Sequence, residues 1–171
     1  MNYMIELTKK QVADYFHRSY TAADGLWFLK IEEKYGFETA LEIGNNVWRI
    51  MPKIQARMLK EMGNLGNGID ALRESLETKL TLEGFMFTIT RNEPGDVLRI
   101  ILTDCPWFNF MRESNREHLA EKVGNIICHT EFGTWAHEFD GNLDVSITEK
   151  LCDGKVRCII TIFQNNRKGC D

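Results

Sequence analysis

The sequence is poor in proline and in basic residues, and it has no long apolar run. Proline occurs 3 times, and 21 lysines and arginines face 25 aspartates and glutamates, which gives a net charge of -4. Nucleic-acid binding relies on clustered basic side chains, so we expect no nucleic-acid partner. No run approaches the roughly 18 to 20 apolar residues that span a bilayer, and the first residues lack the order of a signal peptide. We therefore expect a cytoplasmic protein that binds neither nucleic acid nor membrane.

The chain contains 5 cysteines. An odd number of cysteines in a protein of the reducing cytoplasm favours free thiols or metal ligands over disulfides. Cys170 lies in the polar tail formed by residues 165–171. The other four, which therefore become the candidates for chemistry, are Cys105, Cys128, Cys152 and Cys158.

The first 80 residues have the apolar period of helices. Thr8 and Gln11 have the spacing of a capping box and predict a helix start, and Gly36 is suited to end that helical stretch. The pair Asp24-Gly25 predicts a kink or a separation within it. A further helix is expected over residues 38–62, and Pro52 should bend it or begin a new segment. Residues 63–68 predict a loop within a single domain of residues 1–171.

After residue 84 the apolar period changes from 3.6 to 2. Residues 85–90 and 97–103 predict a hairpin. A capping box at Ser114 and Glu117 predicts a helix that reaches about residue 139, and a last hairpin is expected over residues 143–151 and 156–164, joined across Asp153-Gly154. The fold class is therefore α+β: N-terminal helices, then a four-stranded antiparallel sheet of two hairpins with a long helix packed on one face, then the tail 165–171.

The last hairpin suggests a metal site. A two-residue turn at Asp153-Gly154 would place Glu149 opposite Cys158, with the two Cβ atoms roughly 4.5 to 5.5 Å apart. Their face is the core face, where an unpaired carboxylate is costly, and a divalent cation such as zinc would neutralise it. Strict alternation turns Cys152 away from Glu149, so both can bind only if the turn is bulged. The alternative is that Cys128 and Cys158 are ordinary buried residues.

The order Cys128, Glu149-Lys-Leu-Cys152, Cys158 resembles the 4-vinyl reductase-type domain over residues 84–164. The resemblance implies a structural zinc ion held by Cys128, Glu149, Cys152 and Cys158. In the phenol-sensing members, a tryptophan about 21 residues before the helical cysteine lines the ligand pocket, and Trp107 has that position here. Two features depart from those members: Cys152 and Cys158 are closer in sequence, and no histidine precedes Trp107 at the place that binds the phenol hydroxyl.

We therefore predict a domain that binds or senses a small apolar or aromatic molecule. The expected ligand contacts are aromatic residues: Trp107, Phe108, Phe85, Phe87 and Trp135. Without a following effector domain, a sensor needs a dimer or a partner protein, and the apolar N-terminal helices predict a homodimer.

Two other functions stay open. Asp104-Cys-Pro-Trp107 and the later Cys128-x-x-Glu131 resemble uncharacterised proteins grouped with aminothiazoline-carboxylate hydrolases. That resemblance implies an alternative function, a hydrolase of a small cyclic C–N or C–S compound with Cys105 as nucleophile. A helix N-terminus at Cys105 would lower the thiol pKa, and His129 or His137 would have to serve as the base. A structural interaction domain related to tethering-complex subunits is the third possibility.

Overall fold

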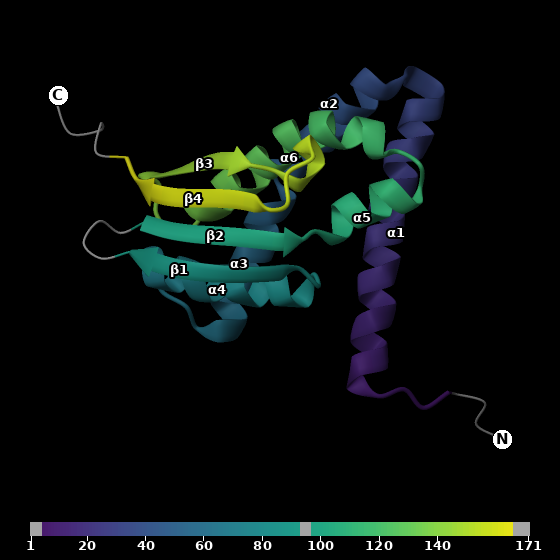
Figure 1. Cartoon of the computed structure of the whole chain (residues 1–171). Coiled ribbons are helices and arrows are strands. Elements are labelled where there is room, and N and C mark those ends of the chain that lie inside the picture. The colour runs from purple at the N-terminus through teal and green to yellow at the C-terminus, as the bar shows by residue number, and fades with distance from the viewer. Residues whose placement is uncertain (1–4, 93–96, 166–171) are drawn as a thin grey trace. The chain divides into compact units, whose positions relative to one another are not determined.

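The computed structural model describes residues 5–92 and 97–165 (Figure 1). The chain divides into two compact units, Met1–Gly44 and Asn45–Asp171. The division does not fall in the glycine-rich residues 63–68, and the single domain stays a prediction. Within the described ranges, no helix is long and apolar enough to cross a membrane.

The first unit is built from α1 (Lys9–Tyr35) and most of α2 (Phe37–Trp48). The predicted capping box is confirmed, because the Gln11 amide N–H donates to the Thr8 hydroxyl and the Gln11 side chain accepts from the Thr8 N–H. Gly36 ends α1 with φ of 86°, a conformation that glycine adopts without strain. The predicted separation at Asp24-Gly25 is wrong. One glycine costs a helix only about 1 kcal/mol, which neighbouring turns offset.

The second unit contains α3 (Met51–Gly63), α4 (Ile69–Leu82), α5 (Pro106–Glu113) and α6 (Glu117–His137). Pro52 and Pro106 lie in the first turns of α3 and α5. An N–H group in the first turn has no acceptor within the helix, so proline, which lacks this group, loses no helical hydrogen bond there. The predicted capping box at Ser114 is wrong. Ser114 instead ends α5, and Asn115 follows with φ of 57°, so α6 begins after Arg116 without a side-chain cap.

The four strands form one antiparallel sheet in the order β1-β2-β4-β3. They are β1 (Met86–Asn92), β2 (Val97–Asp104), β3 (Leu143–Glu149) and β4 (Cys158–Gln164). The predicted α+β class and the four-stranded antiparallel sheet are confirmed. The two predicted hairpins become neighbours through the pairing of β2 with β4, and part of the loop predicted between β1 and β2 lies outside the described residues.

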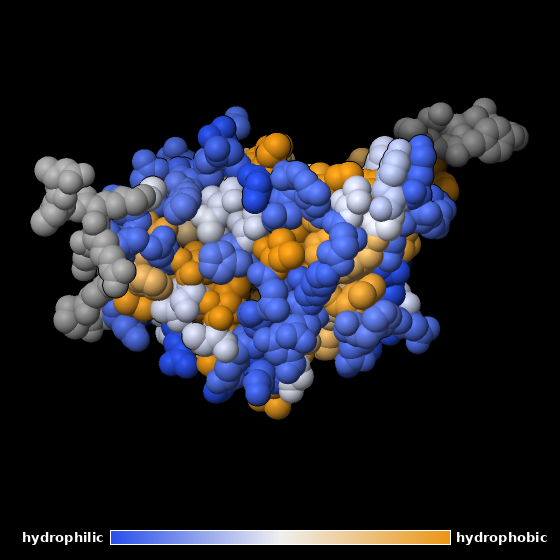
Figure 2. All heavy atoms as spheres, turned by 90° about the horizontal axis from the view of Figure 1, so that it is seen from above, coloured by the Kyte–Doolittle hydropathy of each residue, from blue (hydrophilic) through white to orange (hydrophobic). Residues whose placement is uncertain are grey.

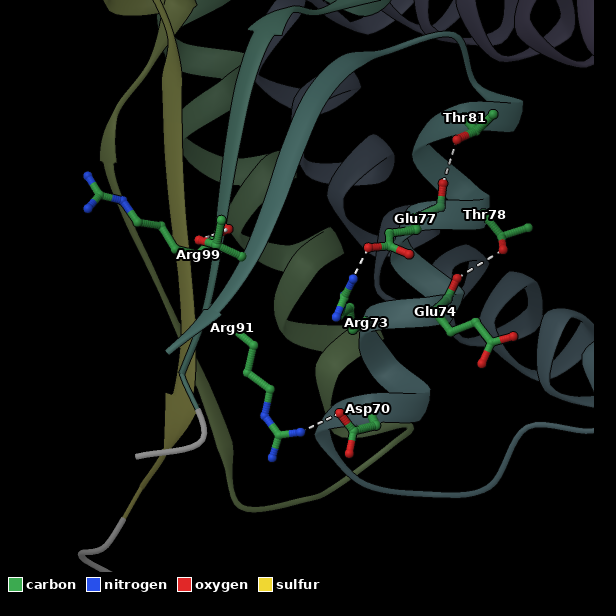
Figure 3. A network of polar contacts seen from close by, with 9 residues as sticks. Asp70, Arg73, Glu74, Glu77, Thr78, Thr81, Arg91 and Arg99 are labelled. Atoms are coloured by element: carbon green, nitrogen blue, oxygen red, sulfur yellow. Dashed lines mark hydrogen bonds and ion pairs between the residues drawn. The ribbon is translucent and has the colours of Figure 1, made fainter. Parts of the chain in front are cut away.

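The core lies on one face of this sheet. Alternate residues of the strands point to the same side, where α4 and α6 cover them, so the long helix packs on the sheet as predicted. The buried core includes Leu72, Leu76, Leu80, Leu98, Ile100, Phe132, Trp135, Ala136, Leu143, Ile160 and Ile162. The exposed side of α4 carries charged and hydroxyl side chains, and Arg91 reaches from β1 to Asp70 at its start, whereas Arg99 points away from α4 (Figure 3).

The predicted two-residue turn of the last hairpin is wrong. The chain leaves β3 at Glu149, forms a short 3-10 helix η1 (Leu151–Asp153) and re-enters the sheet only at Cys158. Gly154 closes η1 with φ of 76°, and its N–H donates to the Leu151 carbonyl. A bulge between Ile147 and Glu149 then pairs Glu149 with Ile159. Glu149 is therefore not opposite Cys158.

Candidate metal and ligand site

Four cysteines come from four elements of the second unit. Cys105 occupies the N-cap position of α5 without a side-chain capping bond, Cys128 lies on α6, Cys152 lies in η1, and Cys158 begins β4. Leu102, near the end of β2, pairs with Cys158, and α6 packs on η1. In Figure 1 the end of β2 leads into α5 at the same end of the sheet where η1 precedes β4. These cysteines, all free thiols, therefore belong to one region of the fold.

Gly124 allows two of the thiols to approach the same point. A Cβ atom at Gly124 would lie 2.8 Å from Sγ of Cys152 and 3.8 Å from Sγ of Cys128. The first distance is shorter than real contacts allow, so a larger residue would displace η1 or its sulfur. The third thiol has a backbone partner, because the Leu151 N–H lies 3.2 Å from Sγ of Cys158. The sulfurs of Cys152 and Cys128 thus both lie near Gly124 on α6. The third sulfur belongs to Cys158, where the chain re-enters the sheet after η1.

All four thiols are disfavoured as thiolates. Burial raises the pKa of Cys105 to about 11 and that of Cys152 to about 12. Burial also raises the pKa of Cys158, and it raises that of Cys128 well above the usual range, where Glu131 and the other three cysteines add to the effect. Without a cation these groups are neutral thiols at neutral pH. A bound divalent cation would reverse that balance.

Glu149, the predicted carboxylate ligand, has another partner. The Arg157 guanidinium donates to it with 2.9 Å from Nε to Oε2 and 3.4 Å from Nη2 to Oε1. This hydrogen bond lowers the pKa of Glu149. The predicted neutralisation of Glu149 by a metal is therefore not needed in this structure, because Arg157 supplies the charge. Two other carboxylates act on the thiols: Glu131 raises the pKa of Cys128 and of Cys105, and Asp153 raises that of Cys152 and of Cys158.

The thiol groups are chemically suited to bind a soft divalent cation, but they are not arranged around one point as metal ligands are. Thiols are the ligands that zinc prefers in structural sites, and the glycine at position 124 leaves room for two of them. Among the residues that the structure describes, no group of three or more histidine, cysteine, aspartate or glutamate side chains already stands so that it could hold a metal ion. The zinc site stays a prediction, and binding would require the thiols to rotate toward one another.

A buried ion cluster lies next to the thiols, and sequence reasoning missed it. Lys79 on α4 is 3% exposed, and its Nζ lies 2.6 Å from Oε2 of Glu83 and 2.7 Å from Oε1 of Glu131. The rings of Phe85 and Trp135 lie 5.7 and 5.4 Å from the same nitrogen. Burial alone would lower the pKa of Lys79, but Glu131 and Glu83 outweigh it and raise the pKa.

One signal could have revealed this cluster. Lys79 follows Leu72 by seven residues and Leu76 by three, so it shares the buried stripe of α4 with them. Glu131 likewise follows Cys128 by three residues on α6, on the stripe that Trp135 continues. A lysine and a glutamate on two apolar stripes predict a buried pair when their helices cover the same face of a sheet.

The predicted ligand contacts lie in two places. Phe85 and Trp135 flank Lys79, and the Trp135 indole, 1% exposed, donates to the Ser75 hydroxyl at 3.2 Å. Phe87 packs against the core from β1. Trp107 and Phe108 are half-buried on α5, where Trp107 lies edge-on to Trp48 with 5.9 Å between ring centroids. All five stay predicted ligand contacts.

The nucleophile proposed for the hydrolase alternative lacks the expected activation. The N–H groups of Phe108 and Trp107 favour a Cys105 thiolate, as a helix N-terminus should, but burial has the larger effect and raises the pKa. Both candidate bases, His129 and His137, are exposed on α6. These features favour the neutral thiol of Cys105 over an activated nucleophile.

These features define an α+β domain whose antiparallel sheet carries helices on its core face and thiols at one end. The chain belongs to a family of unknown function, DUF6125, whose model matches residues 5–157. The chain is also similar to the crystal structure of the phenol-responsive sensory domain of the transcription activator PoxR with phenol. That match has a TM-score of 0.53 and 14% identity, and it covers 97% of this chain and 79% of the other. No curated protein matches. The solved structure shows a shared fold, and the 4-vinyl reductase-type resemblance stays a prediction.

Proposed function

We propose that this protein binds a small apolar or aromatic molecule and acts as a sensory domain. The observation that carries the proposal is the fold shared, over nearly the whole chain, with a sensory domain that responds to phenol. A shared fold does not fix a ligand. The side chains of this chain indicate the class of ligand instead.

Helix α5 offers the clearest ligand contacts. It is a short helix between β2 and α6, and none of its residues is buried, although it carries Trp107, Phe108 and Phe110. A half-buried aromatic ring gains free energy when an apolar molecule covers the rest of it. Trp107 is held edge-on by Trp48, so its ring is oriented before a ligand arrives. Oriented rings lower the entropy cost of binding.

Calorimetric titration with small aromatic compounds, beginning with phenol, tests the proposal. Trp107→Ala should weaken binding at least about 10-fold, which is the loss expected when one large apolar contact disappears. Phe110→Ala is the matched control, since Phe110 lies on the same helix and is 51% exposed. The proposal fails if no compound binds the wild type, or if Trp107→Ala binds as tightly as the control.

We further propose a structural zinc ion held by Cys128, Cys152 and Cys158. Support comes from the thiols of Cys152 and Cys128, which both lie near Gly124, and from the Leu151 N–H at Cys158, since N–H donors favour a thiolate. When bound, zinc would neutralise the thiolates and tie α6, η1 and β4 together. Elemental analysis should find one zinc per chain and less in Cys152→Ala. Metal-free, fully folded protein would contradict the site.

The apolar surface of α1 supports a homodimer. Tyr15, Phe16 and Trp27 are 63%, 65% and 72% exposed, and α1 contains no buried residue. Figure 2 shows hydrophobic side chains that reach the surface among hydrophilic ones. A second copy of the chain would cover such residues. Size-exclusion chromatography with light scattering should give twice the chain mass, and a monomer at every concentration would refute the dimer.

A further inference from the structure

The buried ion cluster of Lys79, Glu83 and Glu131 has more negative than positive groups. Its ammonium group lies between the two carboxylates, so the charges alternate along a row that ends in a carboxylate on each side. Burial raises the pKa of Glu83, and the charge of Glu131 adds to this rise although Lys79 opposes it. An unbalanced negative charge is costly inside a protein. A second cation beside one of the carboxylates would remove the imbalance.

Glu131 is the carboxylate that still has an unsatisfied acceptor. Glu83 accepts a hydrogen bond from Nζ of Lys79 at 2.6 Å. Glu131 is 7% exposed, and the 2.7 Å contact of its Oε1 with Lys79 is an ion pair without hydrogen-bond geometry. Within the described parts of the chain, no group donates a hydrogen bond to this buried oxygen. Such atoms are rare, because each loses the hydrogen bonds that water would supply. A donor on a bound molecule would satisfy Oε1.

A first route of contacts connects Glu131 with Trp107, the proposed ligand contact on α5. The ring of Trp107 packs edge-on against Trp48 of α2. Asn45, three residues before Trp48, accepts a hydrogen bond at 2.8 Å from the hydroxyl of Thr130, which adjoins Glu131 on α6. Helix α5 also packs directly against α6.

A second route runs from the ion cluster along the sheet. The ring of Phe85 lies 5.7 Å from Nζ of Lys79, and Phe85 follows Gly84 directly before β1. A Cβ atom at Gly84 would lie 3.9 Å from Cγ of Pro106, the residue before Trp107. Strands β1 and β2 are paired at these same ends. Trp107 and the ion cluster therefore border the same part of the fold.

We propose that the ligand is a small arylalkylamine in its protonated form, and that Glu131 binds its ammonium group while Trp107 covers its ring. The inference rests on the sensory function proposed above and names the class of ligand for the same site. The ammonium group of the ligand continues the alternation of charge beyond Glu131 and donates to the unsatisfied Oε1. Glu131 thus selects a cation, and Trp107 supplies apolar contact area.

Calorimetric titration with three compounds of matched shape tests the proposal. At neutral pH, benzylamine, benzyl alcohol and ethylbenzene differ only in the group on the benzyl carbon, which is an ammonium, a hydroxyl or a methyl group. The wild type should bind benzylamine about 10- to 100-fold more tightly than ethylbenzene, because hydrogen bonds to charged groups are the stronger ones. Benzyl alcohol should lie between them. Trp107→Ala should weaken the binding of all three compounds.

Substitution of the carboxylate tests the role of Glu131. Glu131→Gln keeps the shape of the side chain and removes its charge, so it should lower the ratio of benzylamine affinity to ethylbenzene affinity about 10-fold or more. Glu121→Gln removes a charge from an exposed position of the same helix and should keep the wild-type ratio. Circular dichroism checks that each variant is folded. The wild-type series tests the proposal by itself if Glu131→Gln does not fold.

The possible failures are distinct. Ethylbenzene or benzyl alcohol that binds the wild type as tightly as benzylamine would overturn the inference and leave the proposed sensory function in place. Phenol binding without benzylamine binding would have the same meaning. An unchanged affinity ratio in folded Glu131→Gln protein would remove Glu131 from the site. If neither phenol nor any of the three compounds binds, the proposed function fails together with this inference.

Discussion

Helix α6 carries two neighbouring polar residues whose surroundings differ. Glu131 belongs to a cluster that contains its own counter-charge, because Lys79 lies between Glu131 and Glu83 at 2.7 and 2.6 Å. Cys128, one turn earlier, lies among thiols that are neutral and repel one another once ionised. Buried charges are stable only when paired. Both buried carboxylates of the ion cluster thus have Lys79 as a partner within the chain, whereas the thiol cluster of Cys105, Cys128, Cys152 and Cys158 would ionise only if a cation such as the proposed zinc were bound.

Removal of the ammonium group should break the ion cluster. Lys79→Met leaves Glu83 and Glu131 buried without a cation, and we expect it to lower the free energy of unfolding by about 3 to 5 kcal/mol. Denaturant unfolding measures the effect. Arg73→Met is the control, because Arg73 pairs with Glu77 on the exposed side of α4 (Figure 3) and should cost less than about 0.5 kcal/mol. Equal losses for the two variants would show that the buried cluster is not paired as described.

A methyl group at Gly124 should disturb the thiol cluster without touching the ion cluster. Gly124→Ala places its Cβ against Sγ of Cys152, so we expect a loss of about 1 to 3 kcal/mol and weaker zinc binding. Gly133→Ala on the same helix meets no atom within 4 Å and should instead raise stability by about 0.5 to 1 kcal/mol. If both variants are stabilised, η1 does not pack on α6 as the structure has it.

The smallest effect on stability is expected when the pair of Glu149 and Arg157 is broken. Arg157→Gln should cost little stability, since the pair is partly exposed and screened by salt. Arg157 lowers the pKa of Glu149 below its usual 4.5, so the pair stabilises the fold above that pH and the contribution is lost as the pH falls through the lowered pKa. The stability of the variant should therefore lack the pH-dependent contribution of this pair. Acid unfolding of the variant and of the wild type measures the difference.

Arg157→Gln also tests whether Glu149 serves as a metal ligand. The variant frees Glu149 from its partner, so zinc affinity should rise if Glu149 is a ligand and stay unchanged if the three proposed thiols bind zinc without it. Measured zinc affinity of the variant and the wild type separates the two. An increase would return Glu149 to the site.

Local signals in the sequence predicted the elements well. Thr8 with Gln11, and Pro52, act within one helical turn, so their effect can be deduced without the tertiary structure. Ser114 shows the limit of such signals: the same spacing was satisfied, but Asn115 in the left-handed region turned the chain and made Ser114 the end of α5.

The candidate site was harder to predict, because pairing across the sheet decides which way side chains point. A shift of one residue reverses the face of every side chain in a strand. The bulge after Ile147 turned Glu149 to the other face of the sheet. The predicted two-residue turn at Asp153-Gly154 had put Glu149 on the core face. Lys79 was missed for a related reason: its partner Glu131 lies on another helix, 52 positions further along the chain.

The central proposal is that the thiol cluster, unlike the ion cluster, binds a cation from outside the chain. Denaturant unfolding of the wild type with and without a zinc chelator tests it most directly. A ligand present at 100 to 1,000 times its dissociation constant stabilises the folded state by about 2.7 to 4.1 kcal/mol. We predict that the chelator removes a contribution of this size from the wild type and none from Cys152→Ser. Identical unfolding curves for the wild type under both conditions would contradict the claim.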